Sequence, residues 1–253
     1  MLASLRAESR KLLTVRSTYC ITGFVTILVI LIAFFLEGWR LNAASLHDPT
    51  QLASDVTGAL TLTIFGAIVA ILLVTHEYRY NTIMYTLTSS NRRSKVLVSK
   101  FIVTSLYAVS LTVLVGVLSP LMAYLGVHAH GHMLVPQTLH YSSLVWRSLF
   151  FGWGYGMAGF LLALLTRNQV ASIVSLFLIP TLAEQLLGEL LLKHNSIYMP
   201  FTALNQVLSG PSSPSSSPMS SAFSPAKAAG IYCVYLVVGG IIAWILFYKR
   251  DAN

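Results

Sequence analysis

The stretch TYCITGFVTILVILIAFFL, residues 18–36, contains no charged residue and decides the class of this protein. A helix rises about 1.5 Å per residue, so about 20 mostly apolar residues cross the hydrocarbon core of a bilayer. This run has the required length and composition, and Glu37 and Arg40 follow it. We therefore expect a membrane-spanning helix from Thr18 to Leu36.

The composition of the whole chain agrees with this expectation. Of 253 residues, 55% are hydrophobic and only 9% are charged, and the mean hydropathy is +0.72. A soluble domain carries roughly 25% charged residues, and a chain with so few charges could not cover a soluble surface with polar groups. The composition argues against a soluble enzyme, a disordered chain and a nucleic-acid-binding domain. Cys20 and Cys233 lie in separate apolar runs, so no disulfide framework is expected.

Five further apolar runs give a prediction of six spans in a single transmembrane domain over residues 1–253. Ahead of the first span, residues 1–16 mix leucines with charged side chains, which indicates an amphipathic helix on the membrane surface. The predicted class is thus an all-α integral membrane protein. The later spans are expected at residues 56–74, 101–127, 149–165, 170–180 and 229–247.

The basic residues predict the orientation of these spans. In membrane proteins Lys and Arg collect in the cytoplasmic segments. If the N-terminus is cytoplasmic, most of the 16 basic residues fall on the cytoplasmic side. Only Arg40, Arg147, Lys193 and Lys227 then fall outside. We expect both termini in the cytoplasm.

The region after the fifth span is irregular. Pro180 removes a backbone donor, so we expect the span to end there and short helices to re-enter the membrane from outside. Glu184 and Glu189 follow in apolar sequence and are candidates for a transport pathway or gate, since acidic residues within membranes are often functional. A helix-capping or interfacial role is the alternative. Residues 209–226 are rich in Ser and Pro, which predicts a flexible extracellular loop.

The segment HEYRYNTIMYTLTSSNRRSKVLVSK, residues 76–100, directly follows the second span. It resembles the cytoplasmic loop of ABC-2-type permeases, the membrane subunits of one class of ABC transporter. The residues that carry the resemblance are Glu77, Tyr78, Asn81, Thr82, Leu87, Thr88, Arg92 and Lys100. A weaker resemblance to the N-terminal surface helix of that family rests on Glu8, Lys11, Leu12 and Arg16.

The resemblance implies a subunit of an ATP-driven exporter in a prokaryotic plasma (inner) membrane. It implies that residues 76–95 form a cytoplasmic coupling helix that docks on a separate nucleotide-binding ATPase subunit, and that the permease pairs with a second copy or a similar chain. Without the resemblance, the segment can also be a solvated basic loop that only sets topology. The expected ATPase-binding residues are Glu77, Tyr78, Arg79, Asn81, Thr82, Arg92 and Arg93.

The chain contains no G-x-x-x-x-G-K-[ST] phosphate loop, so we expect no ATP hydrolysis by this chain alone. It is therefore predicted to be non-catalytic and to hold no cofactor, with ATP and Mg bound by the partner ATPase. The apolar spans suggest an amphiphilic or hydrophobic cargo, such as a drug, a peptide or a lipid-like molecule.

Two other patterns leave alternatives open. Gly152 and Gly156 form a small-xxx-small pair, which permits close helix packing within the chain or across a dimer. His128, His130 and His132 alternate after the third span, but nothing fixes a third or fourth ligand, so no metal site is predicted.

Two other functions remain possible on the sequence. An ion-coupled secondary carrier would use Glu184 as its coupling site, although no inverted repeat is visible. A membrane scaffold or binding protein would have no ATPase partner.

Overall fold

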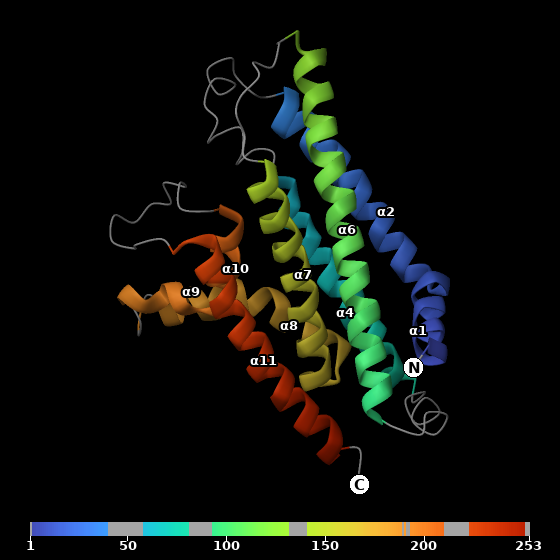
Figure 1. Ribbon diagram of the computed structural model, residues 1–253. Coiled ribbons are helices and arrows are strands. Elements are labelled where there is room, and N and C mark those ends of the chain that lie inside the picture. The colour runs from blue at the N-terminus through green and yellow to red at the C-terminus, as the bar shows by residue number, and fades with distance from the viewer. Residues whose placement is uncertain are drawn as a thin grey trace.

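The structure is a computed structural model that describes residues 2–39, 58–80, 93–131, 141–188, 190, 193–209 and 223–250. These residues form helices joined by short turns, without a strand among them (Figure 1). Six helices in this part are long and apolar enough to cross a membrane, which confirms the predicted all-α class and the number of spans. They are Arg16–Trp39, Ala59–Arg79, Ser94–Ala129, Ser142–Thr166, Gln169–Leu187 and Pro225–Leu246.

Several of these spans consist of consecutive helical elements. The elements are α1 (Leu2–Thr14), α2 (Arg16–Leu31), η1 (Ile32–Trp39), η3 (Ala59–Thr63), α4 (Ile64–Arg79), α6 (Arg93–Ala129), α7 (Tyr141–Thr166), α8 (Gln169–Leu178), η4 (Ile179–Ala183), α9 (Glu184–Leu187), η6 (Lys193–Tyr198), α10 (Pro200–Ser209) and α11 (Pro225–Arg250).

Helix α7 lies at the centre of the bundle and contacts α4, α6, α10 and α11. Glycines allow this close packing. An added Cβ at Gly159 would meet the carbonyl oxygen of Ala67 on α4 at 2.5 Å. The buried core around α7 also includes Leu176 of α8, Leu204 of α10 and Tyr232 of α11.

The first and third spans cross at the end of the bundle far from the chain termini. An added Cβ at Gly38 of η1 would meet the carbonyl oxygen of Ala123 at 2.7 Å and the Cα of Gly126 at 2.8 Å. Because side chains at Gly38 and Gly126 would collide with the opposite backbone, the two helices depend on glycine here. This crossing joins η1 to α6 backbone against backbone.

The fifth span differs from the prediction, because the helix does not end at Pro180. Helix α8 continues through the π-helical segment η4 and the helical turn α9 to Leu187. Pro180 removes one backbone hydrogen bond, and the chain accommodates it with a π-helical turn, a known way for a helix to bend without ending.

The short helices η6 and α10 follow this span, as expected, and α10 packs on α7 and α11. That they re-enter the membrane stays a prediction. Residues 210–222 of the predicted Ser/Pro-rich loop lie outside the described residues, whereas Ser209 ends α10 and Pro225 begins α11.

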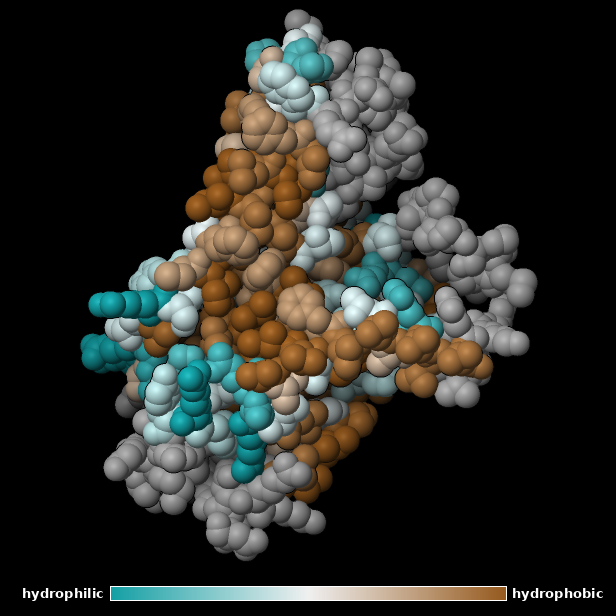
Figure 2. All heavy atoms as spheres, turned by 180° about the vertical axis from the view of Figure 1, so that it is seen from behind, coloured by the Kyte–Doolittle hydropathy of each residue, from teal (hydrophilic) through white to brown (hydrophobic). Residues whose placement is uncertain are grey.

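Hydrophobic side chains cover the middle of the molecule, and hydrophilic ones gather toward two of its ends (Figure 2). A band of this kind is what a membrane-spanning bundle presents to lipid. Both chain termini lie toward the same end of the bundle, the lower end in Figure 1, which is called the terminal end below.

Candidate functional site

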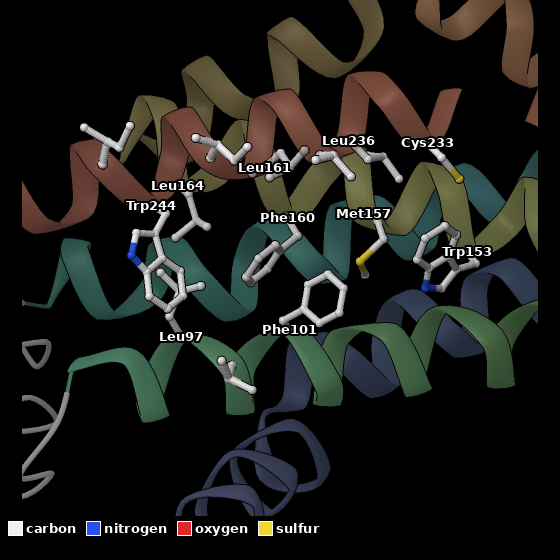
Figure 3. Close-up of a pocket in the computed structure, with 15 residues that line it drawn as sticks. Leu97, Phe101, Trp153, Met157, Phe160, Leu161, Leu164, Cys233, Leu236 and Trp244 are labelled. Atoms are coloured by element: carbon white, nitrogen blue, oxygen red, sulfur yellow. The ribbon is translucent and has the colours of Figure 1, made fainter. Parts of the chain in front are cut away.

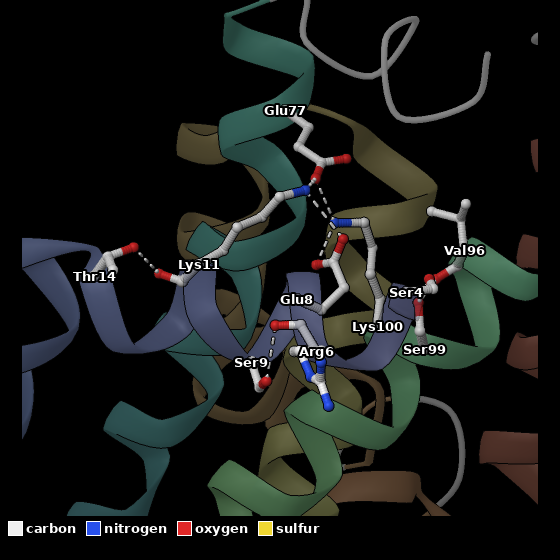
Figure 4. Close-up of polar contacts among 10 residues, drawn as sticks. All are labelled: Ser4, Arg6, Glu8, Ser9, Lys11, Thr14, Glu77, Val96, Ser99 and Lys100. Carbon is white, nitrogen blue, oxygen red and sulfur yellow. Dashed lines mark hydrogen bonds and ion pairs between the residues drawn. The ribbon is translucent and has the colours of Figure 1, made fainter. Parts of the chain in front are cut away.

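Four charged side chains from three elements meet at the terminal end (Figure 4). Lys100 of α6 places its Nζ 3.0 Å from Oε2 of Glu8 on α1 and 2.8 Å from Oε1 of Glu77 on α4. Lys11 of α1 places its Nζ 2.6 Å from the same Glu77 oxygen and 3.1 Å from Oε1 of Glu8. These residues, Glu8, Lys11, Glu77 and Lys100, form the ion cluster.

The amphipathic pattern of α1 explains why the helix lies here. Glu8 is only 2% exposed and faces α6, while Arg6 and Arg10 lie on the exposed face. Ser4 adds a hydrogen bond between its Oγ and Oγ of Ser99, 2.8 Å apart, on the same side of α1. The predicted surface helix is thus attached to the third span by polar contacts.

Burial of the ion cluster is energetically costly unless its charges compensate one another. Glu8, Glu77 and Lys100 are all buried, and a buried charge is costly unless an oppositely charged group with good geometry compensates it. Each of these three charges has an opposite charge within hydrogen-bonding distance, and the cluster of two acids and two lysines is neutral in sum. Removal of one member would leave another buried charge uncompensated.

Lys11 is the most exposed member of the ion cluster, with 44% of its side chain accessible. Partial burial alone would lower its pKa, but the hydrogen bond and charge of Glu77, with the nearby Glu8, outweigh that effect and raise the pKa of Lys11 above 10.5. A raised lysine pKa stabilises the fold at pH values below the unfolded pKa, and the contribution is lost as the pH rises through the folded pKa. The Lys11 contact is therefore fully formed at neutral pH.

A cavity of about 410 Å³ borders the ion cluster, between the α1–α2 corner and α4. Lys11, Ser17, His76 and Glu77 lie on its wall together with apolar side chains. Oε1 of Glu77 accepts two hydrogen bonds, whereas its Oε2 and the hydroxyl of Ser17 have no hydrogen-bond partner among the described residues. One carboxylate oxygen and one hydroxyl beside the ion cluster can thus accept a further hydrogen bond.

The structure separates the predicted ATPase-binding residues into different environments. Glu77 is 5% exposed and belongs to the ion cluster, so its direct contacts are with α1 and α6 rather than with solvent. Tyr78 is half-buried, with the guanidinium of Arg167 5.1 Å from the centre of its ring. Arg79 and Tyr80 are exposed, and Arg79 Nη1 donates to Oε1 of Gln169 at 3.5 Å.

Of the rest of the predicted coupling segment, the structure describes only the residues at its two ends. Asn81, Thr82 and Arg92 lie outside the described residues, and Arg93 begins α6. The second span extends through Arg79. The first residues of the predicted coupling segment are therefore the last turn of a spanning helix.

The second predicted site, around Glu184, has a different geometry. Glu184 is 6% exposed, and its carboxylate accepts hydrogen bonds from the backbone N–H of Phe201 and of Thr202, both at 2.8 Å, and from Oγ1 of Thr202 at 2.9 Å. It therefore caps the N-terminus of α10, where backbone donors lack helical partners. This is the capping role that the sequence left as the alternative to a gate. Glu189 lies outside the described residues.

The glycine pair lies against α6 of the same chain. An added Cβ at Gly152 would collide with the side chain of Thr112, and one at Gly156 would meet Cβ of Ala108 at 2.5 Å. Of the two packing alternatives, these contacts correspond to packing within the chain.

The histidines pack on aromatic rings. His128 stacks on Tyr124 with ring centres 6.2 Å apart, and His130 lies 4.9 Å from the ring of Trp39. His132 lies outside the described residues. The residues that the structure describes contain no group of three or more His, Cys, Asp or Glu side chains suited to a metal.

One buried carboxylate was missed by the sequence reasoning. Glu37, which was treated only as the end of the first span, is 6% exposed and accepts hydrogen bonds from the backbone N–H of Ala59 at 2.7 Å and from Oγ of Ser119 at 3.1 Å. It thus ties the first span to the start of the second span and to α6. Its position directly after an apolar run was the available signal.

The comparison with known families covers most of the chain. Residues 23–252 match the model of a family described as a protein of unknown function, DUF2705. No curated protein matches the sequence.

Proposed function

The chain belongs to the DUF2705 family, and we propose that it is the membrane-spanning permease subunit of an ATP-driven exporter of the ABC-2 type. The observation that supports this best is the ion cluster. The two stretches that resemble ABC-2 permeases, around Glu8 and around Glu77 to Lys100, are distant in sequence yet meet in direct ion pairs. Residues singled out by the resemblance thus act as one unit.

The ion cluster also supports a coupling role for the segment after α4. The chain leaves α4 at Arg79 and enters α6 at Arg93, and Glu77 and Lys100 link these two helices close to those points. Through Glu8, α1 belongs to the same assembly. A force applied to the intervening segment by closure of an ATPase would therefore reach three helices together.

Under this proposal the exposed Arg79 and Tyr80 contact the ATPase, and Glu77 is a positioning residue that holds the helices behind them. The partner ATPase binds ATP and Mg and performs the hydrolysis. A second permease copy or a similar chain completes the pathway. Both termini are cytoplasmic, in a prokaryotic plasma membrane, as the positions of the basic residues favour.

The cargo in this proposal is amphiphilic or hydrophobic, such as a drug, a peptide or a lipid-like molecule. The acidic residues in the described part of the chain are Glu8, Glu37, Glu77 and Glu184, and all of them are buried and bound to other parts of the fold. The described part of the spans therefore presents little negative charge to a cargo. Because Glu184 already accepts three hydrogen bonds, its geometry weighs against an ion-coupled carrier that uses this residue.

The test is co-purification. The chain carries an affinity tag and is co-expressed with the ATPase encoded beside its gene, and the bound ATPase is quantified after detergent extraction. We expect a stoichiometric complex with the wild type. The double variant Arg79→Ala/Tyr80→Ala should lose most of the ATPase, because it removes two exposed side chains at the proposed contact.

The matched control is Lys227→Ala/Tyr198→Ala, which removes an exposed cation and an exposed tyrosine elsewhere on the surface. It should retain the ATPase at the wild-type level. The proposal fails if the folded wild type retains no ATPase, and the contact surface is wrong if both double variants bind it equally. A scaffold protein without an ATPase partner predicts the first of these outcomes.

A further inference from the structure

A groove of about 500 Å³ runs between α6, α7 and α11 (Figure 3). Phe101 of α6, Met157 and Phe160 of α7, and Leu236 of α11 point into it. Among the residues that the structure describes, none of those lining the groove is charged. The indole N–H of Trp153, at one end, donates to Oγ of Ser105 at 2.6 Å, so this polar group is satisfied within the protein.

The rim of the groove faces the surroundings of the bundle. Phe101, Val237, Ile241 and Trp244 border it, and between 37% and 61% of each residue is exposed. An apolar groove with an exposed apolar rim on a spanning bundle is accessible from the hydrocarbon core of the membrane.

The length of the groove suits one lipid chain. Along α11 it extends from Cys233 to Ile245, which is about 18 Å at about 1.5 Å per residue. One leaflet contributes about half of the roughly 30 Å of hydrocarbon in a bilayer. The groove therefore spans about the depth of one leaflet.

Basic residues lie where the groove reaches the terminal end of the bundle. Lys95 is exposed and lies one turn before the lining residue Val98, on the same face of α6. Arg167 follows the lining residue Leu164 at the end of α7, and its Nη2 donates to the carbonyl oxygen of Leu246 at 3.5 Å. An apolar groove with two cations near one end is complementary to an amphiphile with an anionic head and a hydrocarbon tail.

The carboxylates near this end do not oppose such a ligand. Glu8 and Glu77, the acidic residues of the described part that lie at the terminal end, are each paired with Lys100 and Lys11. The groove also has free space, because an added Cβ at Gly240 of its α11 wall would meet no heavy atom within 4 Å.

We propose that this groove binds one acyl chain of an anionic phospholipid from the leaflet at the terminal end, with the phosphate group near Lys95 and Arg167. The proposal does not depend on the transport function. The lipid would fill the space beside Gly240 and attach α11 to α6 through a shared ligand. Only 11% of the apolar 18-residue window in the span that contains α11 is buried within the protein, so most of that window is open to lipid.

Tryptophan fluorescence provides the test. Of the four tryptophans, Trp153 and Trp244 line the groove, so the background Trp39→Phe/Trp146→Phe leaves only these two as reporters. The protein is reconstituted in phosphatidylcholine, and phosphatidylglycerol or phosphatidylcholine brominated on the acyl chain is added as a quencher. We expect saturable quenching by brominated phosphatidylglycerol at about fivefold lower mole fraction than by brominated phosphatidylcholine, and Lys95→Gln should abolish most of this difference.

Two glycines of α11 give a matched pair of variants. Gly240→Leu fills the groove and should remove the preferential quenching, whereas Gly230→Leu, also in open space but outside the groove, should preserve it. Lys227→Gln is the charge control for Lys95→Gln. Equal quenching by the two headgroups in the wild type overturns the proposal, as does an unchanged preference in Gly240→Leu. A dimer that Gly240→Leu dissociates, with no preferential quenching, would instead assign the groove to a second copy of the chain.

Discussion

The ion cluster and the two capping carboxylates neutralise buried acids in different ways. In the ion cluster, Glu8 and Glu77 are compensated by lysines from other elements. Glu37 and Glu184, in contrast, accept hydrogen bonds from backbone N–H groups of Ala59 and Phe201 at the starts of helices. The cluster joins charged side chains of α1, α4 and α6, whereas each cap joins one carboxylate to neutral donors, which are backbone N–H groups and the hydroxyl of Ser119 or Thr202. A change in charge should therefore affect the cluster much more than the caps.

The largest effect is expected for Lys100→Met. This variant leaves the buried Glu8 and Glu77 with only the half-exposed Lys11, and removal of one partner of a buried ion pair costs about 3 to 5 kcal/mol of stability. Unfolding in mixed micelles with increasing dodecyl sulfate measures the loss. Lys95→Met, on the same helix but exposed, is the control and should change stability by less than about 0.5 kcal/mol.

Adding Glu77→Gln to Lys100→Met sharpens this test. The second substitution removes one of the two uncompensated charges and leaves Glu8 with Lys11. The double variant should therefore be more stable than Lys100→Met alone. If the two losses were simply additive, the charges would not be coupled and the description of the cluster would be wrong.

A smaller effect is expected at the Glu184 cap. Glu184→Ala leaves the backbone donors of Phe201 and Thr202 without their acceptor and should cost about 2 kcal/mol. Glu184→Gln retains one carbonyl acceptor and should cost about half as much. If this glutamate were instead the coupling site of an ion-driven carrier, Gln would abolish transport in vesicles while the stability of the protein stayed nearly unchanged.

A still smaller loss of stability is expected when the Glu37 cap is weakened. Ser119→Ala removes one donor to Glu37 but leaves the bond from the N–H of Ala59, and we expect a loss of about 1 kcal/mol. Ser110→Ala, which removes an exposed serine hydroxyl bonded to a carbonyl of the same helix, is the control. A loss at Ser119 no larger than that at Ser110 would show that Glu37 does not tie the first span to α6.

The smallest effect is the pH dependence of Lys11. Because the pKa of Lys11 is raised in the folded protein, its contribution should persist through neutral pH and decline only as the pH rises past 10.5 and through the folded pKa. Thermal unfolding in detergent between about pH 8 and about pH 11.5 can detect this decline. The comparison is with Lys11→Arg, because an arginine keeps its charge throughout this range. A wild type that loses no more stability than Lys11→Arg would contradict the prediction.

The spans were predictable from the sequence because each is set by local composition. Hydropathy over about 20 residues gives the six spans whatever their neighbours are. The end of the fifth span was not predictable in this way, since a proline such as Pro180 can either end a helix or be accommodated in it by a π-helical turn, and the local sequence does not distinguish the two.

The candidate site was predictable in its residues and not in its contacts. Glu8, Lys11, Glu77 and Lys100 were all singled out from two separate stretches, but no local pattern indicates that Glu8 pairs with Lys100, 92 positions further along the chain. For the same reason Glu77 was expected on an exposed docking surface. Glu184 posed a related difficulty, because its partners Phe201 and Thr202 lie 17 and 18 positions further along the chain.

The crossing of Gly38 and Gly126 has a mechanical consequence when it is considered together with the ion cluster. Toward the terminal end, α6 is attached to α1 through Glu8 and Lys100, and to α2 of the first span through a hydrogen bond between the hydroxyls of Thr22 and Tyr107, 2.8 Å apart. At the other end it contacts η1 backbone to backbone at the two glycines. Two helices that are held together near both of their ends can tilt and translate only as one body. The first and third spans therefore form a single unit, and the second span belongs to it as well, because Glu77 binds Lys100 at one end and the N–H of Ala59 binds Glu37 at the other.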